Sequence, residues 1–108
     1  MPVPERIAWA VERLEIQPAD RLLEIGCGRG VAVELICQQL SDGHILALDR
    51  SATAIQAATQ RNAHHVAAGW ATFQAISLED SDLGEQQFDK VFAINVNLFW
   101  TRAPGAVL

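Results

Sequence analysis

Three glycines at alternate positions, Gly26, Gly28 and Gly30, lie in the stretch LLEIGCGRGV, two residues after the acid Glu24. A glycine has no Cβ, so this stretch can turn tightly and let a ligand come close to the backbone. A glycine loop between a strand and a helix is typical of sites for nucleotide-like ligands. The residue types therefore predict a binding loop, and their spacing discriminates between ligands.

The spacing of the glycines disfavours two common ligand classes. A dinucleotide fingerprint, G-x-G-x-x-G, requires a third glycine where this chain has Val31. A P-loop requires Gly-Lys followed by Ser or Thr, but Gly30 precedes Val31 and Ala32. The remaining alternative is a tight turn without a ligand, which is disfavoured because three glycines cost conformational entropy that a simple turn does not require.

The elements around the loop alternate between strands and helices. Such alternation predicts an α/β fold with a parallel sheet, right-handed crossovers and helices on both faces. Ligands bind at the carboxyl ends of the strands in such sheets, where Gly26 and Asp49 are both expected. The pattern predicts helices at 4–15, 29–40 and 52–68, and strands at 21–26, 44–49, 70–76 and 88–96.

Three segments in this order, EIGCGRG, LALDRS and FDKVFAINVNLFW, resemble the motifs of class I S-adenosylmethionine-dependent methyltransferases. The resemblance covers most of the chain. It implies a Rossmann-like three-layer αβα fold with strand order 3-2-1-4, and residues 1–108 as a single cofactor-binding domain. Domains of this family resemble a seven-stranded sheet, so the chain is expected to stop after the fourth strand, with an incomplete C-terminal half.

The resemblance also assigns residues to the methionine end of S-adenosylmethionine. Glu24 would orient the loop and its water contacts, and no catalytic residue can be named. The residues expected at this end are Gly26, Cys27, Gly28 and, at the end of the fourth strand, Asn95. Gly30 is expected as a further cofactor-binding residue of the loop.

The adenosine end is assigned to residues after the second and third strands. Asp49 would accept hydrogen bonds from both ribose hydroxyls, a role that suits the two oxygens of a carboxylate. The alternative for Asp49 is a helix-capping acid, although Ser51 is available as the cap. Arg50 would flank the adenine. The acid that often follows the third strand in this family is absent, so adenine recognition is expected from the backbone N–H of Leu78 together with Ser77 or Glu79.

The composition narrows the class of partner. The 108 residues carry 8 Lys and Arg against 13 Asp and Glu, a net charge of -5 that disfavours a nucleic-acid surface. No apolar run approaches the roughly 18 residues of a membrane span, and the charged N-terminus does not resemble a signal peptide. Two cysteines without metal-type spacing indicate reduced thiols, and the adjacent His64 and His65 are not expected to bind a metal. A cytoplasmic protein is expected.

Two functions remain open from the sequence. The first is methyl transfer to a small molecule by direct displacement; methylation of nucleobase amines is disfavoured because residues 95–98 do not match the N-P-P-Y-like motif of such enzymes. The second is a non-catalytic module that binds a nucleotide or cofactor and retains only the Rossmann-like half. In either case the fourth strand would be an apolar edge, so a homodimer through this edge is expected.

Overall fold

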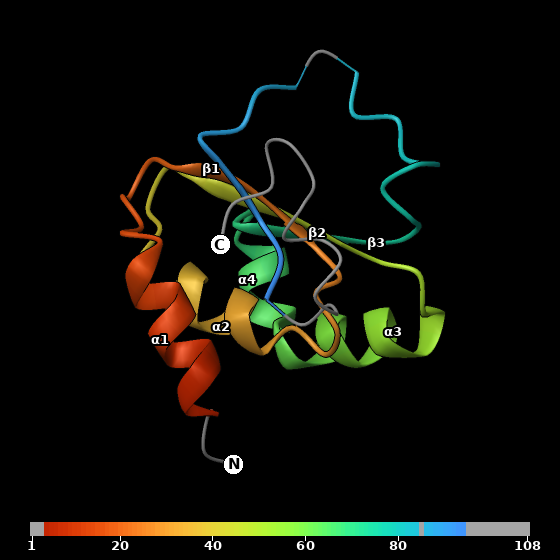
Figure 1. The fold of residues 1–108 in the computed structure, drawn as a ribbon, viewed down its shortest axis with the longest axis horizontal. Helices are drawn as coiled ribbons and strands as arrows, with labels where there is room; N and C mark the ends of the chain where they lie inside the picture. The colour runs from red at the N-terminus through yellow and green to blue at the C-terminus, as the bar shows by residue number, and fades with distance from the viewer. Residues whose placement is uncertain (1–3, 85, 95–108) are drawn as a thin grey trace.

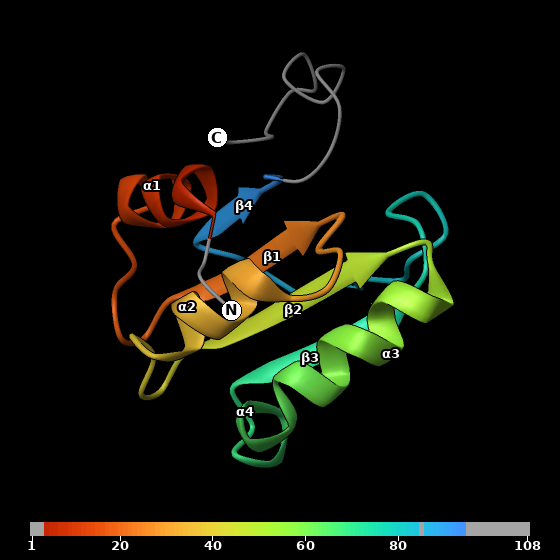
Figure 2. The same ribbon diagram turned by 90° about the horizontal axis from the view of Figure 1, so that it is seen from below.

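A parallel four-stranded sheet forms the centre of the protein (Figures 1 and 2). The computed structural model describes residues 4–84 and 86–94. The spatial order is β3-β2-β1-β4, and every neighbouring pair is parallel. The predicted Rossmann-like α/β fold and its strand order are therefore confirmed. The strands are β1 (Arg21–Ile25), β2 (His44–Asp49), β3 (Ala71–Ala75) and β4 (Lys90–Phe92).

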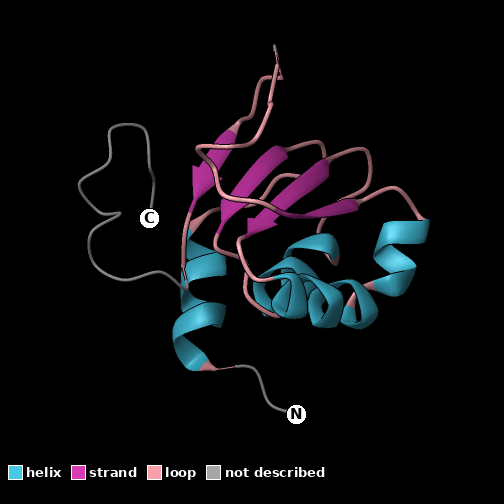
Figure 3. Cartoon of the chain, turned by 90° about the vertical axis from the view of Figure 1, so that its right-hand side faces the viewer, coloured by secondary structure: helices cyan, strands magenta, loops and turns pink. Residues whose placement is uncertain are grey.

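The helices of the described residues gather on one face of the sheet (Figure 3). We expected helices on both faces. The described part of the β3–β4 connection instead crosses the second face without a helix, because its sequence is acidic and lacks an apolar stripe of helical period. The helices are α1 (Glu5–Arg13), α2 (Val31–Cys37), α3 (Ala52–Arg61) and α4 (Ala63–Ala67).

Alternate residues of the strands fill two separate cores. Successive side chains of a strand point to opposite faces, so both faces of a buried parallel sheet are apolar. Leu22, Ile45 and Phe92 face the helices and are fully buried there. On the other face, Leu23, Leu46 and Leu48 are buried against apolar side chains of the β3–β4 connection. Those covering side chains are Ile76, Leu83 and Phe88.

The single helix expected over residues 52–68 is wrong, because the segment breaks into α3 and α4 at Asn62. The backbone of Asn62 leaves helical geometry with φ -107° and ψ 24°. Its side chain is fully buried and bonds outside its own helix, which competes with helix continuation. In α4, after the break, Val66 is 37% exposed.

The fourth strand is shorter than predicted. Its pairing with β1 covers Lys90 to Phe92, whereas we expected a strand over 88–96, of which residues 95 and 96 lie outside the described part. Asp89 precedes the strand and clamps it: its Oδ2 accepts the backbone N–H of Arg21 at 2.8 Å. Lys90 Nζ donates to Asp20 Oδ2 from the same end of the sheet. Polar contacts therefore secure a short β4 at the amino ends of the strands.

Candidate cofactor site

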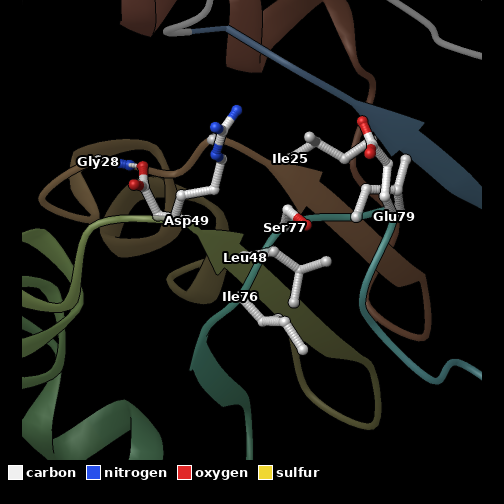
Figure 4. A pocket seen from close by; sticks show the side chains of 10 residues that line it. Ile25, Gly28, Leu48, Asp49, Ile76, Ser77 and Glu79 are labelled. Carbon is white, nitrogen blue, oxygen red and sulfur yellow. Dashed lines mark hydrogen bonds between the residues drawn. The ribbon is translucent and has the colours of Figure 1, made fainter.

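A pocket lies at the carboxyl ends of β1, β2 and β3, where the fold places ligand sites. Its volume of about 420 Å³ falls within the range of small-molecule sites. Figure 4 shows Asp49 and Gly28 at one end of this pocket and Glu79 at the other. The lining residues are Ile25, Gly26, Gly28, Leu48, Asp49, Arg50, Ile76, Ser77, Leu78 and Glu79.

The glycine loop reaches the pocket because its backbone turns sharply at the end of β1. Gly26, Gly28 and Gly30 have φ values of 72°, 57° and 80°, in the left-handed region that favours glycine. The loop is fastened to β2: the backbone N–H groups of Gly26 and Cys27 both donate to the carbonyl of Leu48, at 2.7 and 2.9 Å. The alternating glycines therefore supply a backbone path that other residues could follow only with strain.

Asp49 fixes the loop as well as lining the pocket. Its Oδ2 accepts the N–H of Gly28 at 2.9 Å, and its Oδ1 accepts the N–H of Ser51 at 2.9 Å. Ser51 is the N-cap of α3, with its Oγ accepting from Ala54 N–H at 3.1 Å. A carboxylate has about four lone-pair positions, so both oxygens of Asp49 retain acceptor capacity for a ligand.

Glu24 is the most unusual acid in the site. It is fully buried, and neither carboxyl oxygen has a hydrogen-bond partner among the described residues. Burial, together with the nearby charge of Asp49, raises the pKa of Glu24 to about 8. This shift favours the neutral form of the carboxyl group. Glu24 lies on the helix side of β1 rather than in the pocket lining.

Cys27 is held beneath the loop. Its side chain is fully buried, and its Sγ lies 3.7 Å from the carbonyl oxygen of Gly28. Burial and the neighbouring acids Glu24 and Asp49 raise the pKa of the thiol to about 12. A nucleophile would need a thiolate, so Cys27 has the character of a packing residue.

The segment after β3 forms the opposite end of the pocket. Ser77 Oγ donates to Asp80 Oδ2 at 3.0 Å and lies 3.3 Å from the N–H of Asp80, so its hydroxyl is engaged in a local turn. Leu78 is 42% exposed beside it, unusually high for a leucine. Glu79 and Arg50 add one charge of each sign to the lining. This end combines an apolar surface with polar groups at its rim.

The structure brings together six of the predicted site residues and separates three others from them. Glu24 in β1 and the Cys27 side chain within the loop are buried, and Gly30, the N-cap of α2, is outside the lining. Asn95 is outside the described residues. The six that line the pocket are Gly26, Gly28, Asp49, Arg50, Ser77 and Leu78.

Three apolar lining residues were not among those predicted. Ile25, Leu48 and Ile76 each precede a predicted site residue, at or just beyond the carboxyl end of β1, β2 or β3. Figure 4 shows these three side chains between the two ends of the pocket. The sequence pattern could have predicted these residues, because the last apolar residues of neighbouring parallel strands lie beside the same crevice.

Comparison with protein families gives a match over most of the chain. The model of the family described as "Methyltransferase domain" matches residues 23–108. A relative from Bacillus subtilis (strain 168), YrhH, whose methyltransferase name is itself provisional, is 28% identical over 85 residues. That match covers 79% of this chain and 46% of the relative, so the chain spans about half the length of the curated protein it matches.

Solved structures share the fold at low sequence identity. A SAM-dependent O-methyltransferase of Thermotoga maritima aligns with a TM-score of 0.70 at 15% identity, covering 86% of this chain and 35% of that one. A geranyl diphosphate methyltransferase in complex with SAM gives 0.70 at 16% identity, covering 82% and 36%. Coclaurine N-methyltransferase, bound to N-methylheliamine and SAH, gives 0.69 at 15%, covering 82% and 26%.

Proposed function

The chain belongs to the methyltransferase domain family, and from this premise we propose that it binds S-adenosylmethionine and serves the transfer of its methyl group to a small molecule. The observation that carries the proposal is the meeting of Gly28 and Asp49 at one end of a partly apolar pocket. Methyl transfer requires chiefly that the cofactor and the acceptor be held in line. The residues of this pocket suit that task.

The chemistry of the pocket fits the parts of this cofactor. Asp49 has free acceptor capacity for the two ribose hydroxyls. Ile25, Leu48 and Ile76 offer an apolar surface for a flat base, while Glu79 and Arg50 lie at its rim. Gly26 and Gly28 leave room for the methionine part because no Cβ projects from them. Leu78 and the Ser77 segment would complete the adenine contacts.

The division of labour follows from these contacts. The bound cofactor supplies a methyl group already activated by a positively charged sulfur. The protein residues bind and orient: Asp49 holds the loop through Gly28, and the apolar lining excludes water from the base. The proposed mechanism needs no nucleophilic side chain, in agreement with the raised pKa of Cys27.

A small-molecule acceptor and a cytoplasmic location are part of the proposal. The net charge of -5 favours an uncharged or cationic acceptor over a nucleic acid. Among residues 4–84 and 86–94, no helix combines the length and apolar character needed to cross a bilayer. The two cysteines lack metal-type spacing, which is typical of reduced thiols and supports this part of the proposal.

Calorimetric titration with S-adenosylmethionine, S-adenosylhomocysteine and NAD tests the proposal. We expect binding of the first two and none of NAD. Tight binding of NAD, without a response to the other two, would overturn the proposed cofactor. Transfer of a labelled methyl group to a panel of small acceptors then tests the activity. Binding without transfer to any acceptor would favour the alternative function, a non-catalytic cofactor-binding module.

A further inference from the structure

Asn62 is a fully buried polar side chain outside the pocket, at the junction of α3 and α4. Burial of an amide is costly unless hydrogen bonds replace those to water. Its Nδ2 donates to the carbonyl of Ala58 at 3.0 Å and to the carbonyl of Gly30 at 3.1 Å. The bond to Gly30 joins residues 32 positions apart and connects α3 to the end of the glycine loop.

Gly30 is shaped to receive this contact. A Cβ on Gly30 would lie 2.7 Å from Asn62 Nδ2, which is closer than Cβ atoms approach other atoms in proteins. It would also lie 3.0 Å from the Cβ of Ala58, which is at the lower limit of such contacts. Its φ of 80° is in the left-handed region. The third glycine of the motif therefore serves the close approach of α3, whereas Gly26 and Gly28 line the pocket.

The carbonyl of Gly30 is a branching point for hydrogen bonds. It accepts the N–H of Glu34 at 3.0 Å, within the first turn of α2, in addition to Asn62. A second, more exposed contact joins α3 to α2: Arg61 Nη1 pairs with Glu34 Oε1 at 3.2 Å. That pair is about one-third exposed and contributes little. The buried amide is the stronger link between α3 and the loop.

We infer that Asn62 is a positioning residue for the cofactor site, because it holds the Gly30 end of the glycine loop while Asp49 holds the Gly28 part. Both anchors flank α3, so this helix fixes the loop at two points. A loop rich in glycine has high conformational entropy when it is not held, so ordering it on ligand binding costs free energy. Anchors that hold the loop before the ligand binds reduce this cost. The inference rests on the proposed function for its effect on the cofactor.

The orientation of the Asn62 amide is required by its neighbours. Both groups that it contacts are carbonyl oxygens, so only the NH₂ group can face them, and Oδ1 has no partner among the described residues. An aspartate here would place oxygen against oxygen. Asn62→Asp is consequently expected to disrupt the loop more than Asn62→Ala does, although aspartate and asparagine side chains have nearly the same size.

The test measures the affinity for S-adenosylhomocysteine in Asn62→Ala, with Val11→Ala as the control. Val11 is 4% exposed on α1, so its truncation lowers stability, and it belongs neither to the glycine loop nor to the pocket lining. We expect Asn62→Ala to raise the Kd about tenfold at a temperature where both variants are folded, and Val11→Ala to leave it within about twofold. An unchanged Kd in Asn62→Ala, despite a lowered melting temperature, would overturn the inference.

Amide hydrogen exchange without ligand separates this inference from the proposed function. The N–H groups of Gly28, Gly30 and Glu34 should exchange faster in Asn62→Ala than in Val11→Ala. If the wild type binds neither S-adenosylmethionine nor S-adenosylhomocysteine, the proposed function fails, but the exchange comparison still tests whether Asn62 holds the loop. Equal exchange in the two variants would refute that role. If Asn62→Ala does not fold, Asn62→Ser replaces it in both measurements.

Discussion

Asp49 Oδ2 accepts a hydrogen bond of 2.9 Å from the backbone N–H of Gly28, and this contact joins the end of β2 to the glycine loop that follows β1. The two residues are 21 positions apart, and both line the same pocket. A residue expected to recognise a ligand thus also builds the surface on which the ligand would lie. Substitution of Asp49 should affect the loop and the affinity together.

Asp49→Ala should weaken S-adenosylhomocysteine binding by roughly 1.5 to 3 kcal/mol, the range for hydrogen bonds to charged groups, or about 10- to 150-fold in Kd. Ser51→Ala is the matched control, because it removes the α3 cap at a cost of about 1 kcal/mol in stability without removing a pocket residue. Titration calorimetry gives both affinities. Equal affinities in wild type and Asp49→Ala would leave Asp49 with a structural role only, through its bonds to Gly28 and Ser51.

Glu24 should make the protein less stable as the pH rises. Its folded-state pKa of about 8 exceeds the ordinary value of 4.5, so the folded protein holds a proton that the unfolded chain releases between these two pH values. The stabilising contribution is complete below pH 4.5 and is lost as pH rises through 8, at up to about 1.4 kcal/mol per pH unit.

The isosteric Glu24→Gln variant has no such proton and isolates the effect. The free energy of unfolding can be measured with urea at pH 5 and at pH 8.5 for both proteins. Relative to the wild type, the variant should be more stable at pH 8.5 than it is at pH 5. Because other groups titrate identically in both proteins, they cancel in this difference. A difference that does not vary with pH would show that Glu24 is already ionised in the folded state.

The two cysteines should be unreactive in the folded protein. Burial raises the pKa of both Cys27 and Cys37 to about 12, and the acids beside Cys27 add to this effect. The thiolate is the reactive form, so a disulfide reagent at pH 8 should label neither thiol quickly, and both after denaturation. Rapid labelling of Cys27 under native conditions would mean that the glycine loop opens.

Lys90→Ala should lower stability by about 1 to 3 kcal/mol at pH 7, because it leaves the mostly buried carboxylate of Asp20 without its cation. Burial alone would raise the pKa of Asp20, but hydrogen bonds from Lys90 and Gln17 lower it below its usual value. The contribution is therefore present above pH 3.8 and is lost as pH falls through the lower folded-state value.

Arg61→Ala provides the control for this ion pair. Arg61 and Glu34 form a more exposed pair, for which a loss within about 0.5 kcal/mol is expected. Thermal unfolding at pH 7 compares the two variants directly. An equal loss in both would show that burial of Asp20 adds nothing to the Lys90 contact.

Self-association through the edge of the sheet remains a prediction. Among the described residues, β4 pairs with β1 on one side only. An unpaired strand edge can recruit another strand, so we expect dimers or larger species in sedimentation velocity at raised concentration. A monomer that persists at high concentration would contradict this expectation.

Local patterns in the sequence predicted the order of strands and helices along the chain, but not all of their bounds: the helix predicted at 29–40 is Val31–Cys37, and the helix predicted at 52–68 is divided at Asn62. The strand ending at Asp49 was predicted to the residue, and the glycine loop was correctly placed between β1 and α2, although it begins one residue before and ends two residues after the predicted bounds. These features depend on residues close in sequence: apolar runs, glycines with positive φ and a serine cap. The strand order, by contrast, came from the resemblance to a family.

The sequence by itself determined the sheet-forming segments, the glycine loop and the acid at the end of β2, because each follows from local backbone preference and hydrophobic period. Only the tertiary structure decided that Asp49 holds Gly28, that Asn62 breaks a helix to reach Gly30, and that Glu24 is buried without a partner. Those outcomes depend on contacts between residues up to 32 positions apart. Burial and hydrogen-bond pairing across such separations are set by how the elements pack, which local pattern does not encode.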